Sequence, residues 1–385
     1  MQKVFKQAVT IALTLGVLAG CAGEEESIQK APLPVVESNF TPVKGWSHKV
    51  GSGVGQYFSN LSPAMGYGKL YVADRDGIVQ ALDPETGKVI WTQDLESDVT
   101  AKLSGGLTLS YGKVFIGTEN AEVIALDEET GEEVWRSKVE GEVLAAPLVD
   151  EGLVIVNTSR GVLQALDADN GEDKWRLSGD VPTLTLRGDS APVSISGGVF
   201  WGQANGRLAG ALINTGQMLW QQPIGSPKGS TEIDRLVDVD AQPVISGERL
   251  YAVGYNGNLV AIDLRTGQPV WKRSYSSANN FIVAGSQVYL ITDKDHIVAV
   301  DARSGTEIWQ NKELEYRLLT SPVVINGNIV VGDSEGYLHW LDPYTGEFTA
   351  QQLVDDSGIA VPPLSVDDGY LIMTRDGQIN KMQMP

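Results

Sequence analysis

Cysteine is almost absent from this sequence, since Cys21 is the only one in 385 residues, and a disulfide within the chain is therefore excluded. Histidine is nearly as rare, and His48, His296 and His339 follow no spacing typical of a metal site. Basic residues are also scarce, 29 against 49 acidic ones, for a formal net charge of -20. Sequence-independent binding of nucleic acid needs clustered Lys and Arg, so the composition excludes that class of function.

Motifs of the common enzyme classes are missing as well. The sequence has no P-loop, no nucleophile elbow and no dinucleotide fingerprint. The segments "DRDG" (74–77) and "TRDG" (374–377) lack the acid spacing and the twelfth-position glutamate of a calcium loop, so we interpret both as hairpin turns. We predict no catalytic residue, no metal ligand and no cofactor.

Long apolar runs are confined to the first twenty residues. Lys3 and Lys6 precede "AVTIALTLGVLAG" (8–20), which is shorter than a membrane-spanning helix and typical of a signal peptide. The tetrapeptide "LAGC" (18–21) resembles a bacterial lipobox, which implies that Cys21 is lipidated and becomes the mature N-terminus. Ala22 rather than Asp follows it, which favours the outer membrane. The alternative is an ordinary secretory signal with an unrelated cysteine.

We therefore expect a signal peptide over residues 1–20 and a lipidated N-terminus with a flexible tether over residues 21–43. Each buried methylene of an acyl chain contributes roughly 0.8 kcal/mol, so two or three chains on Cys21 would hold the protein on the periplasmic face of the cell outer membrane. The tether prediction rests on the acids and prolines of "AGEEESIQKAPLPVVESNFTPV" (22–43), which contains little apolar material.

From residue 44 onward the sequence repeats. The phrase "ALDPETGKVIW" (81–91) returns as "ALDEETGEEVW" (125–135) and "ALDADNGEDKW" (165–175), with a tryptophan four residues after a glycine. A seventh copy has Ala350 in the tryptophan position, and successive positions are 38 to 51 residues apart. This period is typical of a four-stranded propeller blade. The tryptophans of the repeat, including the one at the N-terminus discussed below, are Trp46, Trp91, Trp135, Trp175, Trp220, Trp271 and Trp309.

The segment 322–353 shows how one blade is built. Its turns "NGN", "SEG" and "PYTG" separate a first apolar run from the predicted strands "NIVVGD", "YLHWLD" and "FTAQQL". The last copy ends at its third strand, and "KGWSHKV" (44–50), with Trp46, supplies the missing fourth one. The predicted fold class is therefore all-β. Residues 44–385 should form an eight-bladed β-propeller with four antiparallel strands per blade, and the N-terminal strand should close the ring.

We interpret the repeated acid and tryptophan as structural rather than catalytic. The acid should accept hydrogen bonds from backbone N–H groups two or three residues further on, and the glycine should take the left-handed conformation. The tryptophan should cover the edge between neighbouring blades. Leu212 replaces the acid in the fourth blade, and the other acids are Asp83, Asp127, Asp167, Asp263, Asp301 and Asp342.

Two neighbouring connectors between blades are unusually long and should emerge side by side on one face. The first, "RLSGDVPTLTLRGDSAP" (176–192), contains Leu184, Leu186 and Arg187, which have the composition of an interface anchor. The second includes "EIDRLVDVDAQP" (232–243), with Asp238 and Asp240 on one side of an extended segment. We predict that these five residues bind a partner. The acids would orient Arg187 or pair with basic groups of the partner; the alternative is that the leucines fold back onto the propeller.

The pattern A-x-D-x-x-T-G-x-x-x-W resembles the tryptophan-docking repeat of quinoprotein propellers. Together with the lipobox, the acidic tether and eight compact blades, it resembles the BamB family of lipoproteins. The resemblance implies a non-catalytic scaffold of the outer-membrane β-barrel assembly (BAM) complex, which assists the folding and insertion of outer-membrane proteins. It implies docking of the two long connectors on the periplasmic POTRA domains of BamA, with unfolded outer-membrane proteins as further partners.

Two other functions fit a propeller of this kind. A PQQ-dependent dehydrogenase would need long insertions for a funnel, a calcium site and a catalytic aspartate, but about 43 residues per blade leave little material for them. The vicinal disulfide common in those enzymes is excluded by the single cysteine. A periplasmic propeller that binds a small ligand or a polysaccharide in its central channel is the other alternative.

Overall fold

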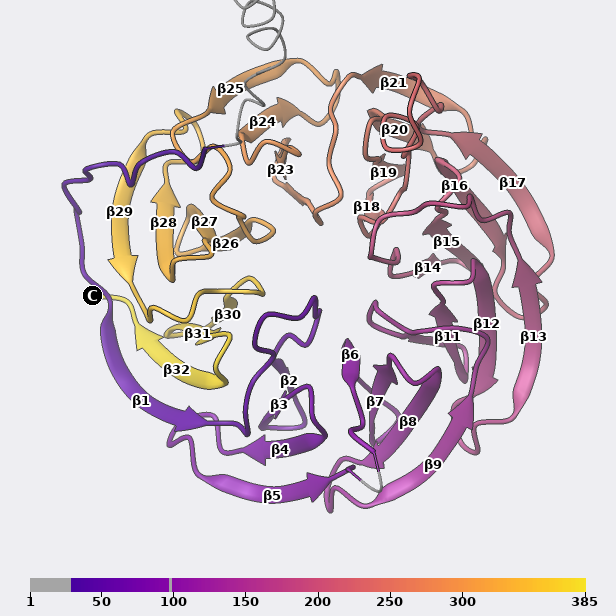
Figure 1. Cartoon of the computed structure of the whole chain (residues 1–385), viewed down its shortest axis with the longest axis horizontal. Helices are drawn as coiled ribbons and strands as arrows, with labels where there is room; N and C mark the ends of the chain where they lie inside the picture. Colours follow the sequence, from indigo (N-terminus) through magenta and orange to yellow (C-terminus); the bar gives the residue numbers. More distant parts are fainter. Residues whose placement is uncertain (1–28, 97–98) are drawn as a thin grey trace, which may run out of the picture.

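The computed structural model describes residues 29–96 and 99–385, so the predicted signal peptide and Cys21 lie outside the described residues. The described part contains 32 strands and no helix, and accordingly no helix that could cross a membrane. The strands form eight four-stranded sheets arranged around a central axis, with the fourth strand of each blade at the outer rim (Figure 1). The predicted all-β, eight-bladed propeller is confirmed.

Each of the first four blades follows the chain order from the axis outward. Blade 1 comprises β2 (Ala64–Gly66), β3 (Lys69–Ala73), β4 (Ile78–Leu82) and β5 (Val89–Asp94). Blade 2 comprises β6 (Leu103–Ser110), β7 (Lys113–Thr118), β8 (Glu122–Asp127) and β9 (Glu133–Lys138). Blade 3 comprises β10 (Leu148–Asp150), β11 (Leu153–Asn157), β12 (Val162–Asp167) and β13 (Asp173–Ser178). Blade 4 comprises β14 (Val193–Ile195), β15 (Gly198–Gly202), β16 (Arg207–Leu212) and β17 (Met218–Pro223).

The second half of the ring has the same order until its last blade. Blade 5 comprises β18 (Val244–Ser246), β19 (Arg249–Val253), β20 (Leu259–Asp263) and β21 (Pro269–Arg273). Blade 6 comprises β22 (Ile282–Ala284), β23 (Gln287–Ile291), β24 (Ile297–Asp301) and β25 (Glu307–Asn311). Blade 7 comprises β26 (Val323–Ile325), β27 (Asn328–Gly332), β28 (Tyr337–Leu341) and β29 (Phe348–Leu353). Blade 8 combines β30 (Leu364–Val366), β31 (Gly369–Met373) and β32 (Gln378–Gln383) with β1 (Val43–Lys49).

Pairing of β1 with β32 closes the ring, as the position of Trp46 predicts. The two strands are antiparallel, and Trp46 lies opposite Lys381. The Lys381 side chain is buried and pairs with Glu85 of blade 1 at 2.9 Å and with Asp368 of blade 8 at 3.1 Å. Blade 8 is thus held by the N-terminal strand and by an ion pair across to the first blade.

The repeated motif forms the turn and the blade contact that the sequence predicts. The Asp83 carboxylate accepts the N–H groups of Glu85 at 3.1 Å and Thr86 at 2.8 Å. Trp91 is buried, and its indole N–H donates to the backbone carbonyl of Glu128 in the next blade at 3.1 Å. The segments 74–77 and 374–377 are likewise turns between the second and third strands of their blades.

The glycine of the motif has a second role that the sequence analysis missed. At Gly131, with φ of +77°, a Cβ atom would lie only 2.6 Å from the indole of Trp91 in the preceding blade. The ring therefore packs directly on the glycine backbone. The same close approach recurs at Gly87, Gly171, Gly216, Gly305 and Gly346, each against the tryptophan of the preceding blade.

Blade 7 exchanges a large and a small residue between two paired strands. In blades 1 to 3 an alanine of the third strand lies opposite the tryptophan of the fourth, as in Ala81 and Trp91. In blade 7 the pair is Trp340 and Ala350, and Trp340 is completely buried. Phe40 packs edge-on against Trp340 with ring centroids 5.2 Å apart. The exchange keeps the volume of the pair and explains the missing tryptophan.

Residues 29–42 differ from the flexible tether expected for residues 21–43. They lie against blades 6 and 7 and reach the start of β1, and we call them the strap (Figure 1). The N–H of Asn39 donates to the carbonyl of Thr349 at 2.9 Å, and the N–H of Ala31 donates to that of Glu315 at 2.9 Å. Acid- and proline-rich composition indicated little core-forming material, but the strap binds through its backbone and through Phe40.

Candidate partner-docking site

The two long connectors emerge on one face and contact each other, as predicted. Connectors between blades share this face with the turns between second and third strands, and we call it the connector face. Loop 4 (residues 179–192) leads from β13 to β14, and loop 5 (residues 224–243) leads from β17 to β18. The N–H of Leu186 donates to the Asp238 carboxylate at 3.1 Å, and the Ser190 hydroxyl donates to the Ala241 carbonyl at 3.1 Å. These bonds join the loops into one patch.

The two leucines of loop 4 have different surroundings. Leu184 is exposed, with 43% of its surface accessible. Leu186 is half-buried and lines the cavity on the ring axis. The alternative expectation, that the leucines fold back onto the propeller, therefore describes Leu186 in part and does not describe Leu184.

Arg187 pairs with acids other than those expected. Its guanidinium donates to Glu142 at 2.9 Å and lies 3.2 Å from Glu119, whereas Asp238 and Asp240 make no ion pair with it. Glu119 also accepts two hydrogen bonds from Arg75, at 3.1 and 2.9 Å. The expectation that the acid pair orients Arg187 was wrong, because the guanidinium instead contacts Glu119 in a turn of blade 2 and Glu142 in the connector between blades 2 and 3. Its side chain remains 48% exposed.

Asp238 and Asp240 are held inside the patch rather than displayed on it. Asp238 is only 1% exposed, so its carboxylate is not accessible to a basic group of a partner, contrary to the second role considered for it. Burial raises its pKa to about 6. Burial, and then the Asp238 charge, raise the pKa of Asp240 to about 7. Burial also raises the pKa of the neighbouring Asp189, with Asp240 adding to the effect.

A cavity of about 520 Å³ opens at the ring axis on the same face, and seven of the eight connectors line it together with β6 of blade 2. A smaller one of about 230 Å³ lies beneath loop 4, between Asn157, Gln203 and Asp189. Residues 29–96 and 99–385 contain no group of three or more His, Cys, Asp or Glu side chains that could hold a metal ion. The arrangement offers a rim for protein contact on which apolar and basic side chains are exposed, among them Leu184 and Arg187 of loop 4 and Ile233 of loop 5.

The fold places the chain among propellers with the quinoprotein type of repeat. The quinohemoprotein alcohol dehydrogenase of Comamonas testosteroni superposes with a TM-score of 0.73 at 16% identity, over 89% of this chain and 76% of that one. Such a likeness shows the fold alone. The crystal structure of BamB from Moraxella catarrhalis superposes with a TM-score of 0.81 at 27% identity, over 89% of this chain and all of that one.

The sequence comparisons then define the family. The family model described as outer membrane protein assembly factor BamB matches residues 75–311. The chain is 68% identical to the BamB of Aliivibrio fischeri over the full length of both, and 47% identical to that of Escherichia coli K12 over 95% of this chain and 96% of that one. This protein belongs to the BamB family of outer membrane protein assembly factors.

Proposed function

We propose that this chain is a non-catalytic scaffold subunit of the BAM complex, and that it docks on the POTRA domains of BamA through loops 4 and 5. The observation that supports the docking site is that one loop bears both an exposed Leu184 and a half-exposed Arg187. Hydrogen bonds to loop 5 hold this loop in place. Preorganisation of this kind lowers the ordering cost of binding. Leucine and arginine together supply an apolar anchor and a planar donor for carboxylates or carbonyls.

The proposed role as a scaffold rests on the small amount of chain outside the blades as well as on family membership. Most connectors and turns between consecutive strands are short. Loop 5, the longest connector, contacts loop 4. A rigid ring with a broad connector face suits the alignment of other proteins, including unfolded outer-membrane proteins. We further propose that lipid on Cys21 holds the ring at the periplasmic face of the outer membrane.

The docking site is tested by Leu184→Asp and Arg187→Glu, introduced into the membrane-anchored protein and followed by co-purification of BamA from detergent extracts. Both changes should reduce recovered BamA at least about tenfold, since loss of an interface anchor costs about 2 kcal/mol or more. Thermal unfolding should change little, because both side chains are about half-exposed and exposed ion pairs such as those of Arg187 contribute little to stability.

Leu212→Asp and Arg265→Glu serve as matched controls, because Leu212, at the end of β16, and Arg265, in the turn between β20 and β21, are exposed on the opposite face of the ring. They should retain BamA fully. Full retention of BamA by the loop 4 variants would refute this docking site. Reduction of a redox dye by the purified protein with added PQQ and calcium would refute the non-catalytic role.

A further inference from the structure

The strap is fixed to the ring along its whole described length. Near β1, Ser38 accepts the N–H of Gln351 at 3.0 Å, and its hydroxyl donates to the carbonyl of the same residue at 3.3 Å. Further toward the N-terminus, the Gln351 side chain donates to the carbonyl of Pro34 at 3.4 Å. These contacts place residues 34–40 along β29, at the outer edge of blade 7 (Figure 1).

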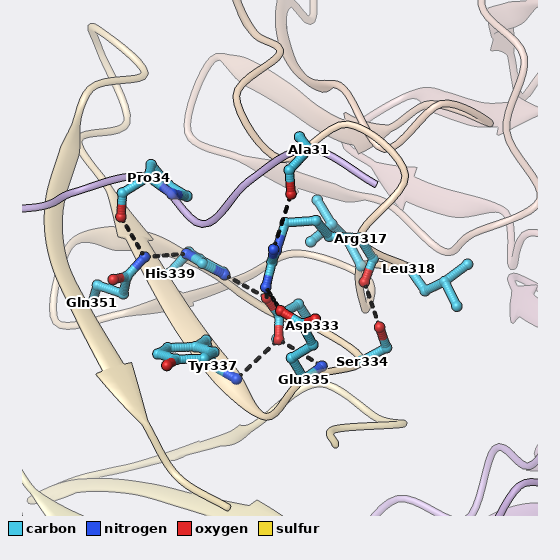
Figure 2. Close-up of polar contacts among 12 residues, drawn as sticks. Ala31, Pro34, Arg317, Leu318, Asp333, Ser334, Glu335, Tyr337, His339 and Gln351 are labelled. Atoms are coloured by element: carbon cyan, nitrogen blue, oxygen red, sulfur yellow. Dashed lines mark hydrogen bonds and ion pairs between the residues drawn. The ribbon is translucent and has the colours of Figure 1, made fainter. Parts of the chain in front are cut away.

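The N-terminal end of the strap contacts a buried arginine, Arg317. The side chain of Arg317, in the connector between β25 and β26, is 2% exposed and donates to Asp333 at 2.8 Å and to the backbone carbonyl of Ala31 at 3.1 Å. It also pairs with Glu335 (Figure 2), and Glu335 in turn forms an ion pair with Lys30. A buried guanidinium is costly unless its donors are satisfied, so the carbonyl of Ala31 completes a site that the ring provides.

The direction of the strap decides on which face the chain leaves the ring. Glu315 and Arg317 lie in the connector between blades 6 and 7, and Glu335 lies in the turn between β27 and β28. Both segments belong to the connector face, which also bears loops 4 and 5. Residues 30 and 31 are therefore fixed at the rim of the connector face, while residues 38–40 have already passed along the outer edge of blade 7.

We infer that the rim of the connector face at blades 6 and 7 is the side of the propeller nearest the lipid bilayer. The inference rests on the proposed lipid anchor at Cys21. Eight residue steps join Cys21 to Gln29, so even a fully extended chain spans at most about 29 Å. Without the strap the first attachment would be at Val43, 22 steps away, and the limit would be about 80 Å. The strap thus shortens the tether almost threefold and fixes its point of attachment.

This orientation links the two attachments of the molecule. The acyl anchor and the docking loops act on one face of a rigid ring, so membrane binding holds the docking loops near the membrane-bound partner. Restriction of this kind raises the effective concentration of the second binding event, provided that the linker reaches both sites.

Energy transfer to a bilayer tests the orientation. The acylated protein carries no other cysteine, so single cysteines introduced at Glu313, Arg160 and Tyr344 accept a donor dye one at a time. Glu313 lies beside the strap exit, Arg160 lies on the connector face at blade 3, and Tyr344 lies on the opposite face of blade 7. The protein is reconstituted alone into vesicles of phosphatidylethanolamine and phosphatidylglycerol containing an acceptor lipid. Transfer should be strongest from the position 313 dye, at least about twofold above the other two.

Release of the N-terminal end of the strap should reduce the difference. Lys30→Glu combined with Ala31→Pro removes the contact with Glu335 and the N–H donated to Glu315, and it leaves every ring residue in place. Residues 34–40 stay bound to blade 7, so the tether lengthens and the excess transfer from the position 313 dye should become smaller. Val35→Glu adds an acid at a fully exposed strap position and should keep the wild-type pattern.

The two failures are distinguishable. Equal transfer from all three labels in the otherwise wild-type protein, or an excess from position 313 that Lys30→Glu/Ala31→Pro leaves undiminished, would overturn the orientation while leaving the anchor intact. Absence of transfer from every label would show that the protein does not bind the vesicles, and would overturn the lipid anchor together with the inference.

Discussion

At the scale of single residues, the eleven-residue repeat forms both a turn and a surface on which the preceding blade packs. The glycine takes positive φ because the turn after the acid requires it, and its missing side chain gives the preceding blade's indole a place to pack. One residue thus satisfies a local and a long-range requirement at once. The sequence alone predicts only the local requirement. The long-range one is hidden because the tryptophan that packs on Gly131 is Trp91, which lies 40 residues earlier in the chain and in another blade.

These two requirements can be separated by substitution. Gly131→Ala and Gly152→Ala both place alanine at φ of +77°, but only at Gly131 would the Cβ meet an atom within 4 Å. Gly152→Ala should cost about 1 kcal/mol from backbone strain alone. Gly131→Ala should cost about 3 kcal/mol, since overpacking against Trp91 adds to the strain. Urea unfolding monitored by tryptophan fluorescence measures both, and equal losses would show that the indole contact adds nothing.

At the scale of strands and loops, local pattern predicted the strands well and the loop contacts poorly. The predicted strand "FTAQQL" is β29, and the predicted seam strand (44–50) overlaps β1 with a shift of one residue. The two loops were placed correctly beside each other, because connector length and blade order fix their positions. The partners of Arg187 were not predictable. Glu119 lies in a turn and Glu142 in a connector, and only the geometry of the ring brings these two segments together. The strap gave no periodic signal because its bonds are made mainly by its backbone.

The buried acids of the loops predict a dependence of stability on pH. Asp240 has a folded pKa of about 7 against an ordinary 3.8, so the folded state binds more protons than the unfolded state between these values. Its favourable contribution is fully present below pH 3.8 and is lost as pH rises through about 7. The free energy of unfolding should therefore fall between pH 5 and pH 8, with Asp240 contributing about 1–2 kcal/mol of that change.

Asp240→Asn isolates this contribution, because the amide cannot ionise beside Asp238. The variant should be more stable than wild type at pH 8 and should gain less on acidification to pH 5. Urea unfolding of both proteins at the two pH values gives the comparison, and Asp169→Asn, at an exposed turn acid, is the control. Parallel pH profiles for wild type and Asp240→Asn would contradict the assignment of a raised pKa to this carboxyl.

At the scale of the whole molecule, one closed ring has seven nearly equivalent contacts in which the indole of one blade packs on the glycine of the next. Closure matters because one of these contacts crosses the seam, so a ring open there would leave one indole and one sheet edge exposed. β1 supplies both missing parts at once: Trp46 packs on Gly87 of blade 1, and its backbone pairs with β32. The N-terminal segment is therefore part of the ring as well as its proposed link to the membrane.

Deletion of residues 43–49 should consequently affect the entire ring. It removes β1, exposes the backbone edge of β32 and leaves Lys381 near a solvent-filled gap, so the free energy of unfolding should fall by at least about 3 kcal/mol, as for loss of a buried tryptophan. The free edge should also promote self-association. Deletion of residues 22–28 removes an equal number of residues outside the described structure and should change neither property. Light scattering and thermal unfolding report both effects, and a monomeric 43–49 deletion with wild-type unfolding would mean that the seam adds nothing to ring stability.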